Sequence, residues 1–474
     1  MSDWRKTKIV ATVGPAVNNK SQLKALVKAG VNVFRLNFSH GSHEDHLKVL
    51  AIVKELNEES GVSVGLLQDL QGPKIRTRQM KNGGVEIYSG QELTITTQKI
   101  VGDEQRISTT YLSLAEDVKK GHIILMDDGK IELEVQKISG TDVLTKVVHG
   151  GLLKSRKGMN LPDTHVSAPS LTDKDVEDLD FGLEQDIGWV ALSFVRTAKD
   201  IYTLKKHIEQ KGKFTKVIAK IEKPEAVEHI DEIIDAADGL MVARGDLGVE
   251  IPMERVPLIQ KEIVYKCNMA YKPVIIATQM LESMMENPRP TRAETNDVAN
   301  AVLDGADALM LSGETAAGKF PIQSVQSMAK TIDYVEKYDR IYNKQHEVEP
   351  GSVLFLYDDL VATACRLATR TGAKAIVGMT KSGYTAYRLS GHRPRAGVFV
   401  FTSNKRLLHT LNLVWGVKVI YYEHKKSTDE TFSDIETTLK EHGYLKKGDV
   451  WITTASMPLH WEKHTNMLKI SVVV

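Results

Sequence analysis

The sequence predicts an α/β protein with three parts: a (β/α)8 barrel, a small all-β domain inserted into it, and a C-terminal α/β domain. Eight short apolar runs end in turn residues, and a helical pattern follows each of them except where the insert begins. After the third run, the chain changes to short strands without helical periodicity. The barrel would take residues 1–70 and 165–345, close to the ~250 residues typical of this fold. The insert would take residues 71–164 and the last domain 346–474.

The first three barrel strands are expected at 8–14, 31–38 and 62–70, since these runs are apolar and bounded by turn residues. Amphipathic stretches at about 20–29 and 42–58 lie between them and predict helices. The segment therefore reads as a βαβαβ unit. This alternation is typical of parallel sheets, in which helices connect successive strands.

The insert is predicted as all-β from runs such as QELTITTQ and HIILMDDGKIELEVQKI, which are rich in β-forming residues and separated by turns. After it, the alternation of strand and helix resumes. The remaining five barrel strands are expected at 187–194, 216–222, 239–245, 273–278 and 307–313. Three strands before the insert and five after it give eight, the number that closes a barrel. A doubly wound open sheet is the alternative, because it has the same alternation and differs in strand count and closure.

The last part of the chain is predicted to be a separate α/β domain. Residues 344–353 have the composition of a linker, and a helix is expected at 358–372. Beyond it, apolar runs such as AIVGM and VKVIYY alternate with helical patterns as far as a final strand in LKISVVV. The chain shows no repeat of solenoid period and no low-complexity tract.

Composition limits the classes of partner. Lys plus Arg (62) balances Asp plus Glu (61), so no overall field favours nucleic acid or an anionic membrane. No run approaches the ~18–20 apolar residues of a membrane span, and the first residues lack a signal-peptide pattern, so a cytoplasmic protein is expected. The two cysteines, Cys267 and Cys365, lie far from any metal or redox motif and are interpreted as buried thiols.

Polar side chains follow nearly every predicted barrel strand. In parallel barrels the active site lies at the carboxyl ends of the strands, so these residues are candidates for chemistry. In chain order they are Arg35, Asn37, Ser39, His40, Asp69, Gln71, Lys74, Arg76, Ser193, Arg196, Lys220, Glu222, Arg244, Asp246, Thr278, Gln279, Ser312 and Glu314. Singly, such residues are often surface ion pairs or helix caps. Together they predict a polar site on one rim of the barrel.

The fifth and sixth strands carry the most informative group. Alternation places Lys220 and Glu222 on the same face of their strand, and Asp246 follows the neighbouring strand. Two carboxylates suit Mg²⁺, which completes its coordination with water and substrate oxygens. A lysine beside them could stabilise a transferring phosphoryl group or an enolate. Arg35 and Arg76 would add planar guanidinium groups for phosphate oxygens.

These residues belong to longer motifs, and on them the chain resembles the pyruvate kinase family over essentially its whole length. The motifs are RLNFSHG (35–41), DLQGPKIRT (69–77), AKIEKPEAV (219–227), MVARGDLGVEIP (241–252), ATQMLESM (277–284), RPTRAETNDVANAVLDGADALMLSGETAAGKFP (289–321) and KSGYTAYRLSGHRPRA (381–396). The resemblance implies phosphoryl transfer from phosphoenolpyruvate to ADP, which gives pyruvate and ATP in the last step of glycolysis. It also implies that the inserted domain is a small β-barrel lid and that the C-terminal domain is regulatory. A divalent metal, Mg²⁺ or Mn²⁺, and a homotetramer are implied as well.

The resemblance also implies roles for individual positions. Glu222 and Asp246 match the divalent-metal ligands of the family, and Lys220 matches the lysine that stabilises the transferring phosphoryl group. The positions that match phosphoenolpyruvate contacts are Arg35, Lys220, Gly245, Asp246 and Thr278. Those that match the nucleotide site are Pro15, His40 and Arg76. Those that match the monovalent-cation ligands are Asn37, Ser39 and Asp69. Ser312 and Glu314 match a proton relay to the enolate, whose final donor stays open.

Two departures from the family pattern are informative. Where potassium-dependent relatives carry Thr, Lys and Glu, this chain has Leu70, Gln71 and Lys74. An ammonium group in place of a carboxylate reverses the local charge, so Lys74 is predicted to replace K⁺ and K⁺ is not expected to be required. The second departure is Asp180, where some relatives have a lysine near the nucleotide phosphates.

The C-terminal domain holds a candidate effector loop. Its residues, which match the effector loop of the family, are Thr380, Lys381, Ser382, Gly383 and Thr385. Hydroxyl and backbone N–H groups there could hold a phosphate, although an ordinary strand-to-helix turn explains the stretch equally well. The corresponding later loop, 455–466, has no glycine. Fructose 1,6-bisphosphate, another sugar phosphate, AMP or no effector therefore all stay open.

Two other functions compete with this one. A metal-dependent lyase or aldolase acting on pyruvate could use the same barrel to stabilise an enolate. The inserted domain and the cations Arg35, Lys220 and Arg76 favour a phosphoryl donor and a lid that excludes water. An inactive metabolite-binding regulator is the other alternative. Every metal and phosphate position holds a chemically competent residue, which argues against it.

Overall fold

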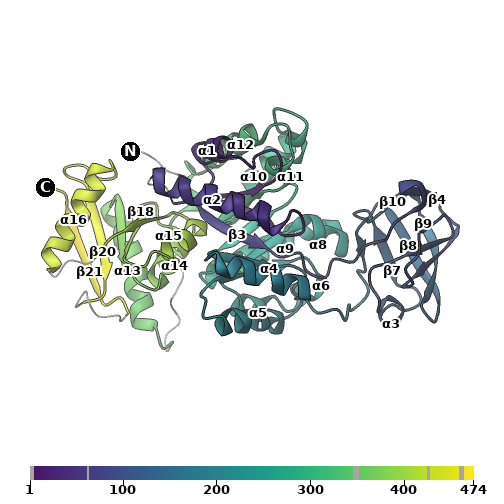
Figure 1. Cartoon of the computed structure of the whole chain (residues 1–474). Helices are drawn as coiled ribbons and strands as arrows, with labels where there is room; N and C mark the ends of the chain where they lie inside the picture. Colours follow the sequence, from purple (N-terminus) through teal and green to yellow (C-terminus); the bar gives the residue numbers. More distant parts are fainter. Residues whose placement is uncertain (1–4, 61–62, 345–347, 349–351, 424–426, 458–463) are drawn as a thin grey trace.

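The computed structural model describes residues 5–60, 63–344, 348, 352–423, 427–457 and 464–474. The chain forms three bodies in a row: the barrel lies in the middle, the inserted domain at one end and the C-terminal domain at the other (Figure 1). The predicted linker at 344–353 lies largely outside the described residues.

Eight parallel strands close the central barrel. They are β1 (Lys8–Val13), β2 (Val33–Asn37), β3 (Gly65–Asp69), β12 (Trp189–Leu192), β13 (Lys216–Ile221), β14 (Gly239–Ala243), β15 (Val274–Ala277) and β16 (Ala308–Leu311). The ring closes where β1 pairs with β16, with Lys8 opposite Ala308 and Ala11 opposite Leu311. The predicted barrel is thereby confirmed, and the alternative of an open sheet is wrong.

Helices surround the barrel and connect its strands. They are α1 (Lys20–Ala29), α2 (His43–Ser60), α4 (Asp173–Glu184), α5 (Ala198–Gln210), α6 (Pro224–Glu228), α7 (Ile230–Ala236), α8 (Arg244–Glu250), α9 (Val256–Met269), α10 (Arg292–Asp304), α11 (Gly313–Ala316) and α12 (Pro321–Val335). Local sequence sets their ends. Thr291 and Glu294 form a capping box at the start of α10, and Gly305, in the left-handed region, ends it.

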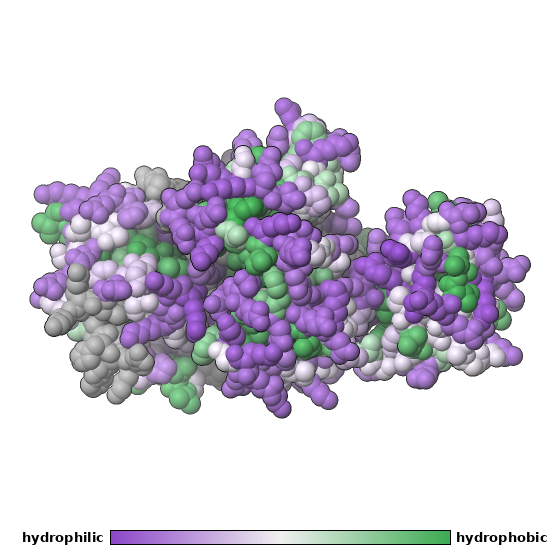
Figure 2. Space-filling model, in the orientation of Figure 1, coloured by the Kyte–Doolittle hydropathy of each residue, from purple (hydrophilic) through white to green (hydrophobic). Residues whose placement is uncertain are grey.

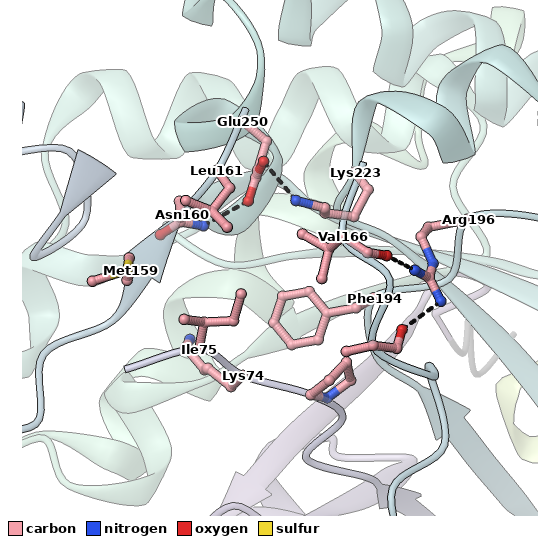
Figure 3. Close-up of a pocket in the computed structure, with 12 residues that line it drawn as sticks. Lys74, Ile75, Met159, Asn160, Leu161, Val166, Phe194, Arg196, Lys223 and Glu250 are labelled. Atoms are coloured by element: carbon pink, nitrogen blue, oxygen red, sulfur yellow. Dashed lines mark hydrogen bonds and ion pairs between the residues drawn. The ribbon is translucent and has the colours of Figure 1, made fainter. Parts of the chain in front are cut away.

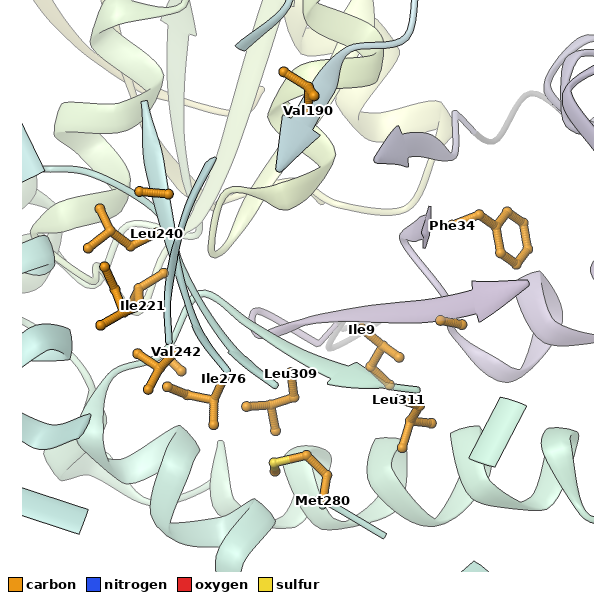
Figure 4. Close-up of a cluster of buried hydrophobic side chains, with 14 of the residues drawn as sticks. Ile9, Phe34, Val190, Ile221, Leu240, Val242, Ile276, Met280, Leu309 and Leu311 are labelled. Carbon is orange, nitrogen blue, oxygen red and sulfur yellow. The ribbon is translucent and has the colours of Figure 1, made fainter. Parts of the chain in front are cut away.

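The barrel core has two layers, because successive strand residues point to opposite faces. Outward-facing residues such as Ile9, Phe34, Ile221 and Leu309 pack against the helices (Figure 4). The inward-facing residues fill the interior of the barrel: Val10, Val33, Leu67, Trp189, Ala191, Ile218, Met241, Ile275, Ala277, Ala308 and Met310. Leu413 of the C-terminal domain joins this interior cluster and is fully buried.

The inserted domain consists of short strands around one hydrophobic cluster. Its strands are β4 (Gly84–Ile87), β5 (Glu92–Thr96), β6 (Arg106–Ser108), β7 (Ile123–Met126), β8 (Ile131–Ser139), β9 (Asp142–His149), β10 (Gly151–Lys154) and β11 (Met159–Asn160), with the short helix α3 (Leu114–Asp117). They form a six-stranded sheet in the order β11-β7-β8-β9-β5-β6 and a two-stranded sheet of β10 and β4. Two chain segments connect this domain to the barrel (Figure 1).

The C-terminal domain is a five-stranded sheet flanked by helices. Its elements are α13 (Phe355–Thr371), β17 (Ala375–Met379), α14 (Tyr384–Gly391), β18 (Gly397–Thr402), α15 (Leu407–Thr410), β19 (Val417–Tyr421), α16 (Thr428–Glu441), β20 (Val450–Ala455) and β21 (Met467–Val472). The strand order is β19-β18-β17-β20-β21, and only β21 runs antiparallel to its neighbour.

The C-terminal domain packs against the end of the barrel opposite the rim. The indole N–H of Trp189 donates to the Thr410 carbonyl oxygen (2.9 Å), close to Leu413. Arg393 donates to both carboxylate oxygens of Asp307, at 3.0 and 3.1 Å, and both side chains are buried. The C-terminal domain therefore covers the floor of the barrel with a buried ion pair and apolar contacts.

A lysine at this contact is expected to make the stability of the protein depend on pH. Lys8 Nζ donates to the Val417 carbonyl oxygen (2.7 Å), and burial, with Arg5 and Lys6 nearby, lowers the pKa of Lys8 to about 7. Between pH 7 and 8.5 the folded protein loses this proton whereas the unfolded chain keeps it, so stability rises with pH. We expect Lys8 to contribute about 2 kcal/mol to this rise, which Lys8→Met removes.

Denaturant titrations of both proteins at pH 7 and 8.5 measure this contribution. Lys216→Met, on a more exposed lysine of another barrel strand, is the control and should keep the slope of the wild type. Equal pH slopes for the wild type and Lys8→Met would contradict the prediction.

Hydrophilic side chains cover most of the face seen in Figure 2, and the inserted domain is set apart from the barrel there. Among the described residues, the structure contains no helix with the length and apolar character that a membrane crossing requires. Cys267 and Cys365 are buried and form no disulfide, as predicted. Burial raises the pKa of both thiols, that of Cys365 to about 12, so neither is a reactive thiolate at neutral pH.

Candidate active site

Lys220 lies at the centre of a group of polar side chains on the barrel rim. Its Nζ atom lies 2.9 Å from Glu222 Oε1 and 3.3 Å from Asp69 Oδ1, and it donates to Ser193 Oγ at 2.8 Å. Lys220 is on β13, with Ser193 just past β12 and Asp69 at the end of β3, so three consecutive strands of the ring supply these residues. The predicted proximity of Lys220 and Glu222 is confirmed.

Two buried carboxylates hold Lys220 in its charged form. Burial opposes the ammonium charge, but Asp69 and Glu222 outweigh it and raise the pKa of Lys220. Burial also opposes the charge of Asp69, yet Lys220 and Arg35 lower the pKa of that carboxyl group. Lys220 therefore keeps its positive charge at neutral pH.

Arg35 extends the group by one strand. Its Nε donates to Asp69 Oδ2 (2.7 Å) and its Nη1 donates to Thr12 Oγ1 (2.9 Å). Asp69 thus lies between Arg35 on one side and Lys220 on the other. Both cations are oriented before any substrate binds, which limits the reorganisation needed during a reaction.

Glu222 and Asp246 could hold a divalent cation. Glu222 Oε2 accepts a hydrogen bond from the Phe194 N–H (2.8 Å), which orients the carboxylate. Burial raises the pKa of Glu222, and the nearby charge of Asp246 raises it further, against the effect of Lys220. A bound cation would relieve this repulsion, and two carboxylates are a usual protein share of a Mg²⁺ site. Within the described part of the chain, no group of three or more His, Cys, Asp or Glu residues could hold a metal.

The predicted monovalent-cation positions lie beside this group. Asn37 Oδ1 accepts a hydrogen bond from the Ser39 N–H (3.1 Å). The carbonyl oxygen of Asp69 accepts one from the N–H of Phe38, which lies between Asn37 and Ser39 (3.0 Å). Lys74, the predicted replacement for K⁺, contacts the candidate divalent-metal pair, with its Nζ 3.4 Å from Asp246 Oδ1. A protein cation therefore lies next to a carboxylate of the candidate metal pair.

Thr278 and Gly245 meet at the neighbouring strand ends. Thr278 Oγ1 accepts a hydrogen bond from the Gly245 N–H (2.7 Å). Thr278 and Gln279 have φ angles of 67° and 53°, which β-branched residues such as threonine rarely adopt. The predicted strand at 239–245 ends earlier, at Ala243, because Arg244–Glu250 is helix α8.

Ser312 and Glu314 form a pair at the end of β16. Glu314 Oε2 accepts a hydrogen bond from the Ser312 N–H (2.7 Å), and Oε1 accepts one from the Leu281 N–H (3.1 Å). Burial raises the pKa of Glu314, although these backbone N–H groups oppose the shift. Among the described residues, the buried Ser312 Oγ has no hydrogen-bond partner, so it could bond a substrate or water.

Among the described residues, the three predicted nucleotide-site residues form no hydrogen bond or ion pair with Lys220. Arg76 is in the segment that leads into the inserted domain, where its Nη1 donates to the Arg156 carbonyl oxygen (3.2 Å). Pro15 and His40 are exposed in loops after β1 and β2. Asp180 faces another helix, where its carboxylate contacts His207 (2.7 Å) and Lys211 (2.6 Å).

The candidate effector loop forms a turn before α14. Thr380 Oγ1 accepts a hydrogen bond from the Gly383 N–H (3.0 Å). Ser382 Oγ accepts one from the Tyr384 N–H (3.3 Å). Thr385 is buried against Thr465, with 2.8 Å between their hydroxyl oxygens, whereas Lys381 and Ser382 are exposed. The later loop at 455–466 lies partly outside the described residues.

Several residues of the site had little or no signal in the sequence. Thr12, which orients Arg35, lies within a predicted strand and is not distinguished by its position there. The Phe194 N–H that holds Glu222 is a backbone group, so no residue type could reveal it. The pair of Lys223 and Glu250 (2.8 Å) lies 27 positions apart, beyond any local spacing rule.

The fold and this rim define a class of barrel enzymes in which paired carboxylates and fixed cations bind small anionic substrates. The family model for the pyruvate kinase barrel domain matches residues 4–325, and that for the pyruvate kinase alpha/beta domain matches residues 358–471. The chain therefore belongs to the pyruvate kinase family.

Individual proteins that are similar to this chain belong to the same family. A pyruvate kinase of Geobacillus stearothermophilus is 44% identical over 476 residues, which cover 99% of this chain and 80% of the relative. A pyruvate kinase of Sporosarcina psychrophila is 43% identical, and the match again covers 99% of this chain and 80% of the relative. The crystal structure of a pyruvate kinase from Cryptosporidium parvum superposes with a TM-score of 0.92 at 36% identity, covering 99% of this chain and 96% of that one.

Proposed function

We propose that this chain transfers the phosphoryl group of phosphoenolpyruvate to ADP, which gives pyruvate and ATP. The observation that carries this proposal is the position of Lys220 between the buried carboxylates of Glu222 and Asp69, with Asp246 close enough to act on both Lys220 and Glu222. A fixed cation beside a carboxylate pair is suited to the charge that builds up on a transferring phosphoryl group.

Phosphoenolpyruvate would bind on the rim between two groups of residues. Arg35 and Lys220 would contact its phosphoryl oxygens, and both are already oriented by Asp69. Gly245, Asp246 and Thr278 would contact the rest of the molecule, and the hydrogen bond between Thr278 and Gly245 fixes their relative position. Binding to a preformed site avoids part of the entropy cost of assembling the reacting groups.

Glu222 and Asp246 would hold the divalent cation, Mg²⁺ or Mn²⁺. The cation would supply positive charge that polarises the substrate oxygens. Phosphoryl transfer leaves an enolate, which must gain a proton to become pyruvate. Ser312 and Glu314 would relay this proton, because Ser312 Oγ lacks a partner among the described residues and burial raises the pKa of Glu314. Either group could be the last donor.

ADP would bind near the loops of Pro15 and His40, with Arg76 delivered by the inserted domain. Because Arg76 lies in the segment entering that domain, the position of the domain would set the distance of its guanidinium group from the rim. We further propose domain limits of 1–70 with 165–345, 71–164 and 346–474, and a homotetrameric assembly. The exposed residues Lys381 and Ser382 would contact a phosphorylated effector.

We expect catalysis without K⁺, since the side-chain nitrogen of Lys74 lies 3.4 Å from Asp246. Replacing K⁺ by tetramethylammonium should leave the rate of the wild type unchanged. Lys74→Glu should lower that rate by tenfold or more (on the order of 1–3 kcal/mol), and added K⁺ should restore much of it. The measurement is initial rate against K⁺ concentration for both proteins. Strong activation of the wild type by K⁺ would contradict this assignment.

A coupled assay tests the proposed function. Pyruvate and ATP should form in equal amounts from phosphoenolpyruvate and ADP, only when a divalent cation is present. A lyase or aldolase would instead act on pyruvate adducts without ADP. Absence of turnover with tight binding of both substrates would point to an inactive regulator.

A further inference from the structure

A hollow lies where the inserted domain joins the barrel (Figure 3). Its empty volume is about 470 Å³, part of it open to solvent. Apolar side chains such as Ile75, Met159 and Phe194 line it, together with the polar residues Asn160, Lys223 and Glu250. The two segments that connect the inserted domain to the barrel both contribute to its wall.

Asn160, Lys223 and Glu250 form a buried cluster in this wall. Lys223 Nζ lies 2.8 Å from Glu250 Oε2, and the two side chains are only 7% and 2% exposed. Asn160 Nδ2 donates to the other carboxylate oxygen, Glu250 Oε1, also at 2.8 Å. One oxygen of Glu250 therefore bonds the barrel and the other bonds the inserted domain.

The cluster connects the inserted domain to the candidate active site. Asn160 is the last residue of β11, at the exit of the inserted domain. Glu250 is the last residue of α8, the helix that carries Gly245 and Asp246. Lys223 directly follows Glu222 in the chain. Each barrel residue of the cluster is thus on the same short segment as a proposed ligand of the metal or substrate.

We propose that Asn160, Lys223 and Glu250 are positioning residues that hold the exit of the inserted domain against α8 and so set the position of this domain relative to the site. The part of this proposal that concerns the reaction rests on the proposed function. Lys223 neutralises and orients the Glu250 carboxylate through Oε2, and Asn160 donates a hydrogen bond to the other oxygen, Oε1. Hydrogen bonds to buried charged groups are among the stronger ones in proteins, which suits a contact that must hold a whole domain.

A second contact keeps the exit segment attached when Asn160 is changed. Arg196, on the barrel, donates to the carbonyl oxygens of Val166 and Ala168 a few residues further along. Variants of Asn160 therefore remove one contact between the exit segment and the barrel and leave the Arg196 contact intact. They also leave the Lys223–Glu250 pair in place, so no buried charge loses its ionic partner.

The distance between the domains tests the proposal in the full chain. Spin labels on Lys137→Cys of the inserted domain and Lys206→Cys of α5 report this distance, since both positions are exposed while Cys267 and Cys365 are buried. Asn160→Ala should broaden the distance distribution of the free protein, with an about tenfold loss of the observed arrangement relative to others. Asn160→Asp should shift it further, because its carboxylate faces that of Glu250. Gln105→Ala, on an exposed amide of the inserted domain, should match the unchanged protein.

Steady-state kinetics add a measurement that a purely structural role would not change. Asn160→Ala should raise the KM for phosphoenolpyruvate about threefold or more, with a smaller effect on kcat and an unchanged thermal midpoint. Wild-type distance distributions in both Asn160 variants would overturn the proposal, and so would an altered distribution with wild-type KM. The distance measurement needs no turnover, so it tests the cluster even if the proposed reaction is not observed.

Discussion

Lys220→Met is expected to lower kcat by about a thousandfold or more while the protein stays folded. The ammonium group lies within 3.3 Å of two carboxylates and is held charged, so it opposes the negative charge of the transferring phosphoryl group. Removing one preorganised electrostatic group of this kind costs about 10²–10³ in kcat, and a full charge should cost at least as much. Initial rates at saturating substrates, with circular dichroism to check folding, measure the effect.

The matched control for this variant is Lys216→Met. Lys216 starts the same strand at its other end, where it pairs with Asp238 on the far side from the rim. We expect near-normal kcat for this protein. If Lys220→Met kept more than about a tenth of the wild-type rate, the role assigned to Lys220 in charge stabilisation would be wrong.

Arg393→Met is expected to destabilise the protein by about 3–5 kcal/mol, because it leaves Asp307 as a buried carboxylate without its cation. Arg393 is 3% exposed and Asp307 is 5% exposed, and the guanidinium group also lies 4.9 Å from the ring centre of Trp415. Because Asp307 precedes β16 and Arg393 follows α14, the loss should loosen the contact between the barrel and the C-terminal domain.

Denaturant unfolding followed by tryptophan fluorescence measures this loss, since Trp415 reports the contact directly. Arg395→Met is the control: its ion pair with Asp339 is largely exposed, so we expect a change of at most about 1 kcal/mol. Equal midpoints for the two variants would mean that the buried pair adds no more stability than the exposed one.

The barrel could be predicted from the sequence because its strands are buried on both faces and therefore read as apolar runs. The end of one strand was predicted too late: the expected strand 239–245 includes Arg244 and Gly245, yet these residues begin helix α8. At this point Thr278 Oγ1 accepts a hydrogen bond from the Gly245 N–H, and that partner lies 33 positions away. Local pattern contains no information on such a contact.

The same limit applies to the site. Alternation along one strand placed Lys220 and Glu222 together, and the rule for parallel barrels placed Asp246 near them. Asn160 and Glu250 are 90 positions apart in the sequence, and Lys8 and its hydrogen-bond partner Val417 are 409 positions apart. Contacts of this kind depend on how whole domains dock, which a single sequence does not encode in any local spacing.

Leu413 has a consequence for how this protein can be rearranged. Because a side chain from residue 413 completes the interior of a barrel that begins at residue 8, the catalytic unit is not a self-contained module. A polypeptide shortened before this segment would expose the buried ends of Trp189 and Leu67 to water. Swapping C-terminal domains between relatives should therefore succeed only when the incoming domain carries a side chain of matching volume at this point.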